Sequence, residues 1–135
     1  MPVVVEILTE PTQQDLVDLQ KIYHDAPQWL FAPHQDGQGL IDACLGDATL
    51  VAARFNDRLL GAARLHIRDS VAHISHLCVR KITRRRGVGE RLVNEAGKIA
   101  EQSGAQLRLL APAGHLEAQA LAAKLHLPLD IQADT

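Results

Sequence analysis

The chain has 135 residues, the size of one compact domain, so we expect a single domain over residues 1–135. Its formal net charge is −2, from 14 Lys and Arg against 16 Asp and Glu, which argues against a nucleic-acid partner because general nucleic-acid binders rely on a basic surface. The sequence also lacks a membrane-length apolar run, a disulfide framework and a metal-binding motif, so we expect a cytoplasmic protein with no metal and no membrane partner.

The first third of the chain alternates strand and helix signals. Residues 3–8 (VVVEIL) are apolar and β-branched, which predicts a strand. Thr12 is a suitable N-cap for an amphipathic helix that stops before Pro27. Residues 27–39 hold two prolines and two glycines and are interpreted as a loop, whose apolar side chains either fold onto the core or touch a ligand. A short helix is expected near residues 39–45.

A paired signal follows at residues 49–67 (TLVAARFNDRLLGAARLHI). Two apolar arms flank the dipeptide Asn56-Asp57, which suits left-handed backbone angles, so the segment is predicted to form a β-hairpin. Alternation along the first arm puts Arg54 and Asn56 on one face near the tip. These two groups either recognise a partner or serve only the strand and the turn.

The second half continues the alternation and predicts an α/β fold. Residues 71–80 (VAHISHLCVR) are predicted to form a strand, and an amphipathic helix beginning near residue 88 ends at Gly104. Residues 107–112 (LRLLAP) are predicted to form a buried strand, and residues 115–125 a final helix. The remaining residues are enough for one short strand.

A basic, glycine-spaced turn, TRRRGVGE at residues 83–90, lies between a strand and a helix start. Backbone N–H groups in such a turn converge, and the first turn of a helix adds partial positive charge, so the segment is predicted to bind an anion. Gly87 and Gly89 let a diphosphate approach the backbone, and Arg84, Arg85 and Arg86 supply planar donor groups. The alternative is a solvated basic turn that only connects the two elements. A Walker A loop is excluded because no GK[ST] follows.

The pattern Arg84-x-x-Gly87-x-Gly89, after a strand and before a helix, resembles the pyrophosphate loop of the GNAT acetyltransferase superfamily, and the order of elements agrees. The resemblance implies a GNAT-like α/β fold with a mixed central sheet flanked by helices, and acetyl-CoA or CoA as the bound cofactor. The backbone predicted to hold the pantetheine arm belongs to Leu77, Cys78 and Val79. The residues predicted to wrap the pyrophosphate are Thr83, Arg84, Arg85, Arg86, Gly87, Val88, Gly89 and Glu90.

Three longer strings are similar to the PanZ (PanM) family of GNAT-like proteins: DLQKIY (18–23), AARFNDRLL (52–60) and VRKITRRRGVGERL (79–92). Members of this family bind acetyl-CoA and dock on the zymogen of aspartate 1-decarboxylase. They promote its self-cleavage and couple CoA supply to pantothenate biosynthesis. The resemblance implies the same role for this chain, with Arg54 and Asn56 as the residues that grip the zymogen.

An active N-acetyltransferase, which would acetylate a small-molecule or peptide amine, is the alternative function. Acetyl transfer needs a base for the amine and usually an acid for the leaving thiolate, and many GNAT enzymes supply that acid as a tyrosine in the last helix. Residues 113–135 contain no tyrosine, and the single tyrosine of the chain is Tyr23. His76 is the candidate base, with a structural role as the other interpretation. The missing acid favours the regulatory function.

Overall fold

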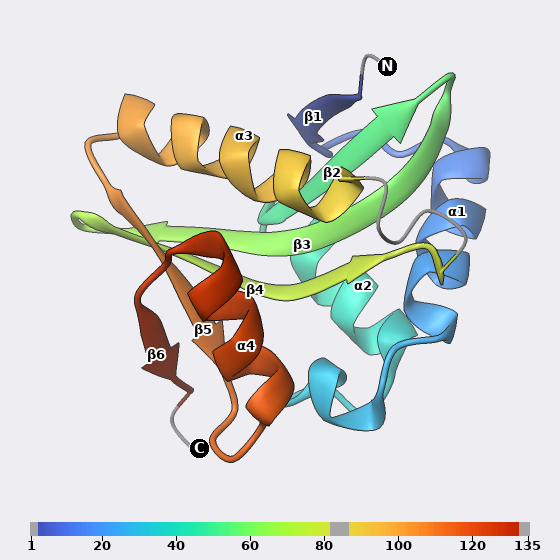
Figure 1. The fold of residues 1–135 in the computed structure, drawn as a ribbon. Helices are drawn as coiled ribbons and strands as arrows, with labels where there is room; N and C mark the ends of the chain where they lie inside the picture. The colour runs from blue at the N-terminus through green and yellow to red at the C-terminus, as the bar shows by residue number, and fades with distance from the viewer. Residues whose placement is uncertain (1–2, 82–86, 133–135) are drawn as a thin grey trace.

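In the computed structural model, which describes residues 3–81 and 87–132, six strands form one sheet in the order β1-β2-β3-β4-β5-β6 (Figure 1). Neighbouring strands from β1 to β4 are antiparallel, and β5 and β6 continue the sheet in parallel with β4. The strands are β1 (Val4–Ile7), β2 (Leu50–Phe55), β3 (Arg58–Arg68), β4 (Val71–Val79), β5 (Gln106–Ala111) and β6 (Leu129–Ile131). The sheet is therefore mixed, as expected from the sequence.

Helices cover both faces of this sheet. They are α1 (Gln13–His24), the short 3-10 helix η1 (Gln28–Phe31), α2 (Gly37–Gly46), α3 (Val88–Gln102) and α4 (Leu116–Leu125). One buried cluster joins α3 and α4 to the sheet, and a second cluster joins α1, η1 and α2 to the opposite face (Figure 1). The strand and helix predictions are confirmed for every one of these elements except η1.

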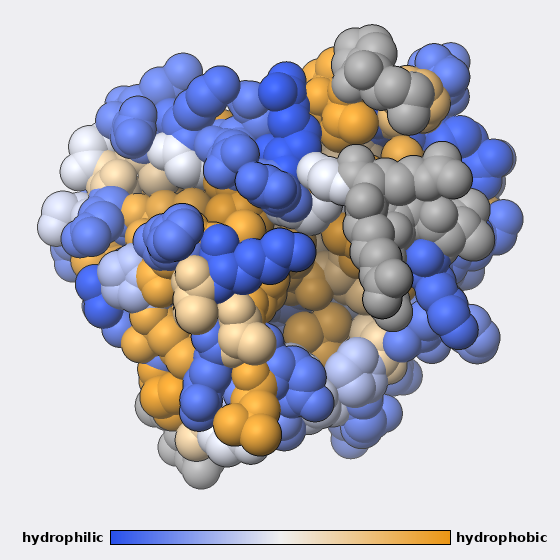
Figure 2. All heavy atoms as spheres, in the orientation of Figure 1, coloured by the Kyte–Doolittle hydropathy of each residue, from blue (hydrophilic) through white to orange (hydrophobic). Residues whose placement is uncertain are grey.

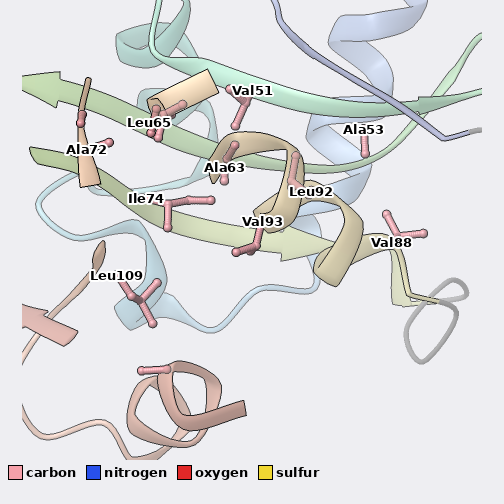
Figure 3. Packing of buried hydrophobic residues seen from close by; sticks show 14 residues of the cluster. Val51, Ala53, Ala63, Leu65, Ala72, Ile74, Val88, Leu92, Val93 and Leu109 are labelled. Atoms are coloured by element: carbon pink, nitrogen blue, oxygen red, sulfur yellow. The ribbon is translucent and has the colours of Figure 1, made fainter. Parts of the chain in front are cut away.

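The core explains why the central strands read as nearly continuous apolar runs. Val51 and Ala53 of β2 belong to the cluster under α3, whereas Leu50 and Ala52 belong to the cluster under α1 and α2. A strand that is buried on both faces needs apolar side chains at successive positions. Figure 3 shows the α3 cluster, in which side chains of the helix pack onto β2, β3 and β4.

Two local sequence signals, a helix cap and a hairpin turn, are found where they were predicted. Thr12 and Asp15 form a capping box at the start of α1, in which each side chain accepts a hydrogen bond from the other residue's amide at 3.1 Å. Asn56 and Asp57 have φ angles of 48° and 65°, as the hairpin turn requires. The segment 27–39 is more ordered than the predicted loop, because it contains η1 and the first turn of α2.

Two buried carboxylates tie α1 to the β2–β3 hairpin. Asp15 receives two hydrogen bonds from Arg54, at 2.9 and 3.1 Å. Asp18 is fully buried and accepts hydrogen bonds from Arg58, at 2.7 to 3.1 Å, and from the amide of Leu59 at 3.1 Å. Burial by itself would raise the pKa of Asp18, but these hydrogen bonds outweigh it and the pKa is lowered. The ionised carboxylate therefore stabilises the folded chain.

Asp18→Asn is expected to lower stability at pH 7 and to flatten its acid dependence. A carboxyl group whose pKa is lower in the folded chain stabilises the fold above its unfolded pKa of about 4, and this stabilisation is lost as the pH falls through the folded pKa. Urea denaturation between pH 7 and pH 2 measures both effects. Asp25→Asn, at the exposed end of the same helix, is the control. Parallel stability curves for Asp18→Asn and the unaltered chain would contradict the assignment.

Candidate functional site

A bulge interrupts β4 in the middle of the sheet. The register with β3 shifts between Ala62 and Arg64, so that His76 and Leu77 together face a single residue of β3. His76 has a φ of 57°, in the left-handed region that a residue with a side chain rarely adopts. The hydroxyl of buried Tyr23 in α1 donates a hydrogen bond to the His76 carbonyl at 2.7 Å. This contact holds the bulge from the α1 side.

The strands β4 and β5 separate at this bulge. β5 pairs with β4 only through Val71–Ile74, and the two strands diverge from Ser75 onward. A cleft of about 630 Å³ occupies the gap, a size typical of small-molecule sites. The later half of β4, the start of α3, the end of β5, α4 and η1 all line it. Figure 2 shows a hollow with a hydrophobic floor in this region.

The first turn of α3 opens onto one end of the cleft. Gly87 is the N-cap with a φ of 80°, and no side chain among the described residues caps the turn. Gly89 is the second residue of α3, and a Cβ at this position would lie 3.4 Å from the side chain of Val79. Uncapped N–H groups at a helix start, with no Cβ in front of them, suit a bound anion such as a diphosphate. The site therefore fits the phosphate end of the cofactor that the sequence implied.

The cleft brings together all the predicted cofactor-binding residues that the structure describes. Residues of that prediction that line it are Leu77, Cys78, Val79, Gly87, Val88, Gly89 and Glu90. The other four, Thr83, Arg84, Arg85 and Arg86, lie outside the described residues. The thiol of Cys78 is directed away from the cleft and donates to the carbonyl of Ile22 in α1 at 3.2 Å. Cys78 thus belongs to the site through its backbone.

The ring of His76 makes internal hydrogen bonds through both nitrogens. Nε2 lies 2.9 Å from the carbonyl oxygen of Ala32, which only accepts, so Nε2 carries the proton. Nδ1 then accepts from the hydroxyl of Ser75 at 2.8 Å. Burial lowers the pKa of His76, although the Ala32 contact partly opposes this, and the ring is neutral at pH 7. This arrangement favours the structural interpretation of His76 over a role as a base.

Tyr23 and Ser75, which bind the His76 carbonyl and ring, were not predicted from the sequence, and neither were the cleft residues of β5 and α4. Strict alternation in β4 would place residues 74 and 78 on the same face, yet Ile74 packs under α3 and Cys78 packs against α1. The bulge shifts the phase between them. One signal was present: a tyrosine on the apolar face of α1 needs a partner for its hydroxyl when it is buried.

The two predicted partner-binding residues lie outside the cleft, at the tip of the β2–β3 hairpin. Arg54 is committed to internal ion pairs with Asp15 at 2.9 Å and with Glu6 at 3.0 Å, and these hydrogen bonds raise its pKa. Its side chain keeps 23% of its surface exposed. Asn56 is exposed in the turn, beyond the end of β2. Asn56 therefore does not share the strand alternation that was predicted to pair it with Arg54.

Comparison with known proteins identifies the family. Residues 2–129 match the family model described as "Acetyltransferase (GNAT) domain, PanZ". The chain belongs to the PanZ family. It is similar to the PanD regulatory factor of Salmonella typhimurium, with 54% identity over 46 residues that cover 34% of this chain and 36% of the relative. It is also similar to the PanD regulatory factor of Escherichia coli, with 38% identity over 84 residues, 62% of this chain and 58% of the relative. Both matches cover less than two thirds of the relative's length.

The fold is shared with solved acetyltransferases. The PaiA N-acetyltransferase of Thermoplasma acidophilum, crystallised with coenzyme A, superposes with a TM-score of 0.67 at 17% identity, over 92% of this chain and 88% of that one. This likeness confirms the predicted GNAT-like fold of a PanZ-family chain. Within residues 3–81 and 87–132, no helix is long and apolar enough to cross a membrane, and no group of three or more side chains is arranged to hold a metal ion.

Tyr23→Phe is expected to lower the free energy of unfolding by about 1–2 kcal/mol, because the buried His76 carbonyl loses its donor. The ring and its edge contact with Phe31, at 6.3 Å between centroids, are retained. Urea denaturation measures the loss. Hydrogen exchange should become faster in Ser75–Val79 and stay unchanged in β1 and β2. Unchanged stability together with unchanged exchange in β4 would show that the hydroxyl does not hold the bulge.

Proposed function

We propose that this PanZ-family protein is an acetyl-CoA-binding regulator that promotes self-cleavage of the aspartate 1-decarboxylase zymogen and so couples CoA supply to pantothenate biosynthesis. The observation that carries the proposal is the cleft between β4 and β5, which ends at the uncapped first turn of α3. The names of the Salmonella and Escherichia relatives support the regulatory part.

The ligand is proposed to lie along the cleft with its phosphates at α3. The pyrophosphate would accept hydrogen bonds from the amides of Gly87–Glu90, and the arginines at 84–86 would add charge-assisted contacts. The pantetheine arm would follow the backbone of Leu77–Val79, where β4 has diverged from β5. Amide groups in such an arm can pair with a strand edge in the way that a neighbouring strand does.

Gly89→Asp is expected to weaken acetyl-CoA binding at least tenfold, because a carboxylate would stand where the pyrophosphate lies. An acidic residue in the first turn favours the helix itself, so the loss should not come from unfolding. Isothermal titration calorimetry measures the affinity. Gly46→Asp is the matched control, because Gly46 lies outside the cleft and has nothing within 4 Å of its Cβ position.

Equal affinities of Gly89→Asp and the unaltered chain would reject the ligand assignment. The affinity of the unaltered protein for acetyl-CoA should also fall as the salt concentration rises, because salt screens the attraction between the phosphates and the protein.

Regulation is favoured over catalysis by the groups around the cleft. Both ring nitrogens of His76 are engaged by Ser75 and Ala32, so the base that the sequence suggested is not available to an amine. The last helix, α4, contains no tyrosine to protonate a thiolate. An N-acetyltransferase would release CoA thiol in proportion to an added amine, whereas a regulator would leave its thioester intact while the zymogen is cleaved.

The hairpin tip is proposed as the surface that meets the zymogen. Asn56 is exposed there and offers both a donor and an acceptor to a partner backbone. Arg54 is held by Asp15 and Glu6, and its guanidinium also donates to the carbonyl of Asp57 in the turn at 3.4 Å. Arg54→Ala would leave buried Asp15 without its cation, so a stability loss would obscure any docking effect.

Asn56→Gly is therefore the sharper test of docking. Glycine keeps the left-handed turn at φ 48° and removes only the amide side chain. We expect normal acetyl-CoA binding and no promotion of zymogen cleavage. Gel electrophoresis of the zymogen measures the cleavage. Asp57→Gly, the other turn position, is the matched control and should keep full activity. Full cleavage with Asn56→Gly would remove the hairpin tip from the docking surface.

A further inference from the structure

An aromatic stack closes the end of the cleft opposite the first turn of α3. The rings of Trp29 in η1 and His115 at the start of α4 lie parallel within 16°, with 4.3 Å between centroids. Pro27, Trp29 and Leu30 line the cleft at this end. η1 lies well apart from the start of α3, on the other side of β4 in the view of Figure 1. A ligand anchored at α3 would thus point its far end at this wall.

Three contacts hold this wall, formed by Trp29 and Leu30 of η1, in place. Phe31, the next residue after Leu30, is buried in the cluster under α1 and α2. The carbonyl of Ala32 accepts the hydrogen bond from the His76 ring at 2.9 Å. The stack with His115 ties Trp29 to α4. Movement of Trp29 away from the cleft end would therefore disturb packed or hydrogen-bonded neighbours, and the wall limits the length of whatever lies against it.

The first turn of α4, which follows His115, carries a negative charge that lines the cleft. Glu117, in the first turn of α4, is exposed and lines the cleft two residues after His115. The cationic side chain on the same helix that lines the cleft, Lys124, is two turns further along α4. A carboxylate at the far end of a ligand would therefore meet Glu117 rather than a cation, and like charges at close range oppose binding.

We propose that Trp29 and Glu117 select the acyl group of the bound thioester, so that the site takes CoA thioesters of short, uncharged acyl groups. The inference rests on the proposed function, in which the cleft binds CoA. An acetyl group buries its methyl against the apolar wall. A long acyl chain has to displace Trp29 from His115, and a dicarboxylic acyl group brings its free carboxylate to Glu117.

Calorimetric titration with CoA, acetyl-CoA and octanoyl-CoA tests the length limit. We expect octanoyl-CoA to bind the unaltered protein at least tenfold more weakly than acetyl-CoA, and Trp29→Ala to bring the two affinities within about threefold of each other. Leu116→Ala is the control, because Leu116 is 75% exposed, adjoins His115 and does not line the cleft. Trp29→Phe keeps a ring in place and should shift the ratio partway, which preserves the test if Trp29→Ala does not fold.

The charge limit is tested with butyryl-CoA and succinyl-CoA, which share a four-carbon acyl chain. Succinyl-CoA should bind more weakly to the unaltered protein, and Glu117→Gln should reduce the difference at least threefold. Trp29 is the only tryptophan, so its fluorescence reports on the wall directly. Octanoyl-CoA should change the emission more than acetyl-CoA does.

The outcomes separate the inference from the function on which it rests. Octanoyl-CoA binding as tightly as acetyl-CoA, or a ratio unchanged in both Trp29 variants, would overturn selection by Trp29 while CoA binding stands. An unchanged succinyl-to-butyryl ratio in Glu117→Gln would overturn selection by charge. No binding of CoA or acetyl-CoA by the unaltered protein would instead overturn the proposed function.

Discussion

The hydrogen bond between the Tyr23 hydroxyl and the His76 carbonyl, 2.7 Å long and fully buried, is the contact on which the cleft depends. A left-handed residue in the middle of a strand is costly and persists only where its surroundings hold it. Tyr23 supplies that hold from α1, and the His76 ring adds a second through Ala32. β4 bends at this point and β5 does not follow it, so a gap opens inside a sheet that is closed elsewhere. A bulge that re-aims a strand is a common neighbour of functional sites.

The two faces of the sheet contribute different parts of the site. α3, packed on one face through Leu92 and Val93, brings its uncapped first turn to one end of the cleft. The layer on the other face contributes η1, whose Trp29 closes the opposite end. Both layers meet the ligand space only because β4 and β5 part between them. A single backbone irregularity thereby joins the uncapped start of α3 to an apolar cleft, and the proposed function places the pyrophosphate of CoA at the first and its thioester end in the second.

Buried charge fixes the position of the hairpin tip, the proposed docking surface. Asp15 and Asp18 are both buried on α1, and each is paired with an arginine of the β2–β3 hairpin. Burying two carboxylates is costly unless they are paired and hydrogen-bonded, so α1 and the hairpin keep one relative arrangement. This arrangement leaves Asn56 exposed at the turn. Arg54, for which the sequence left a partner-binding and a structural role open, is paired with Asp15 and Glu6.

The sequence by itself determined the strands and helices, because their signals lie within a few residues, and for the same reason it predicts an anion-binding turn at residues 83–90. Thr12 and Asp15 cap α1 across one turn, Asn56 and Asp57 are neighbours, and alternation in β2 reports burial on both faces. The mixed sheet and one part of the cleft lining, residues 77–79 and 87–90, followed from family resemblance. Tertiary structure alone decided the bulge at His76, the pairing of Arg54 and the stack of Trp29 on His115. Tyr23 and His76 are 53 residues apart, and Arg54 and Asp15 are 39 apart, so no local pattern relates them. Such contacts arise only when the packing of helices on a twisted sheet brings distant side chains together.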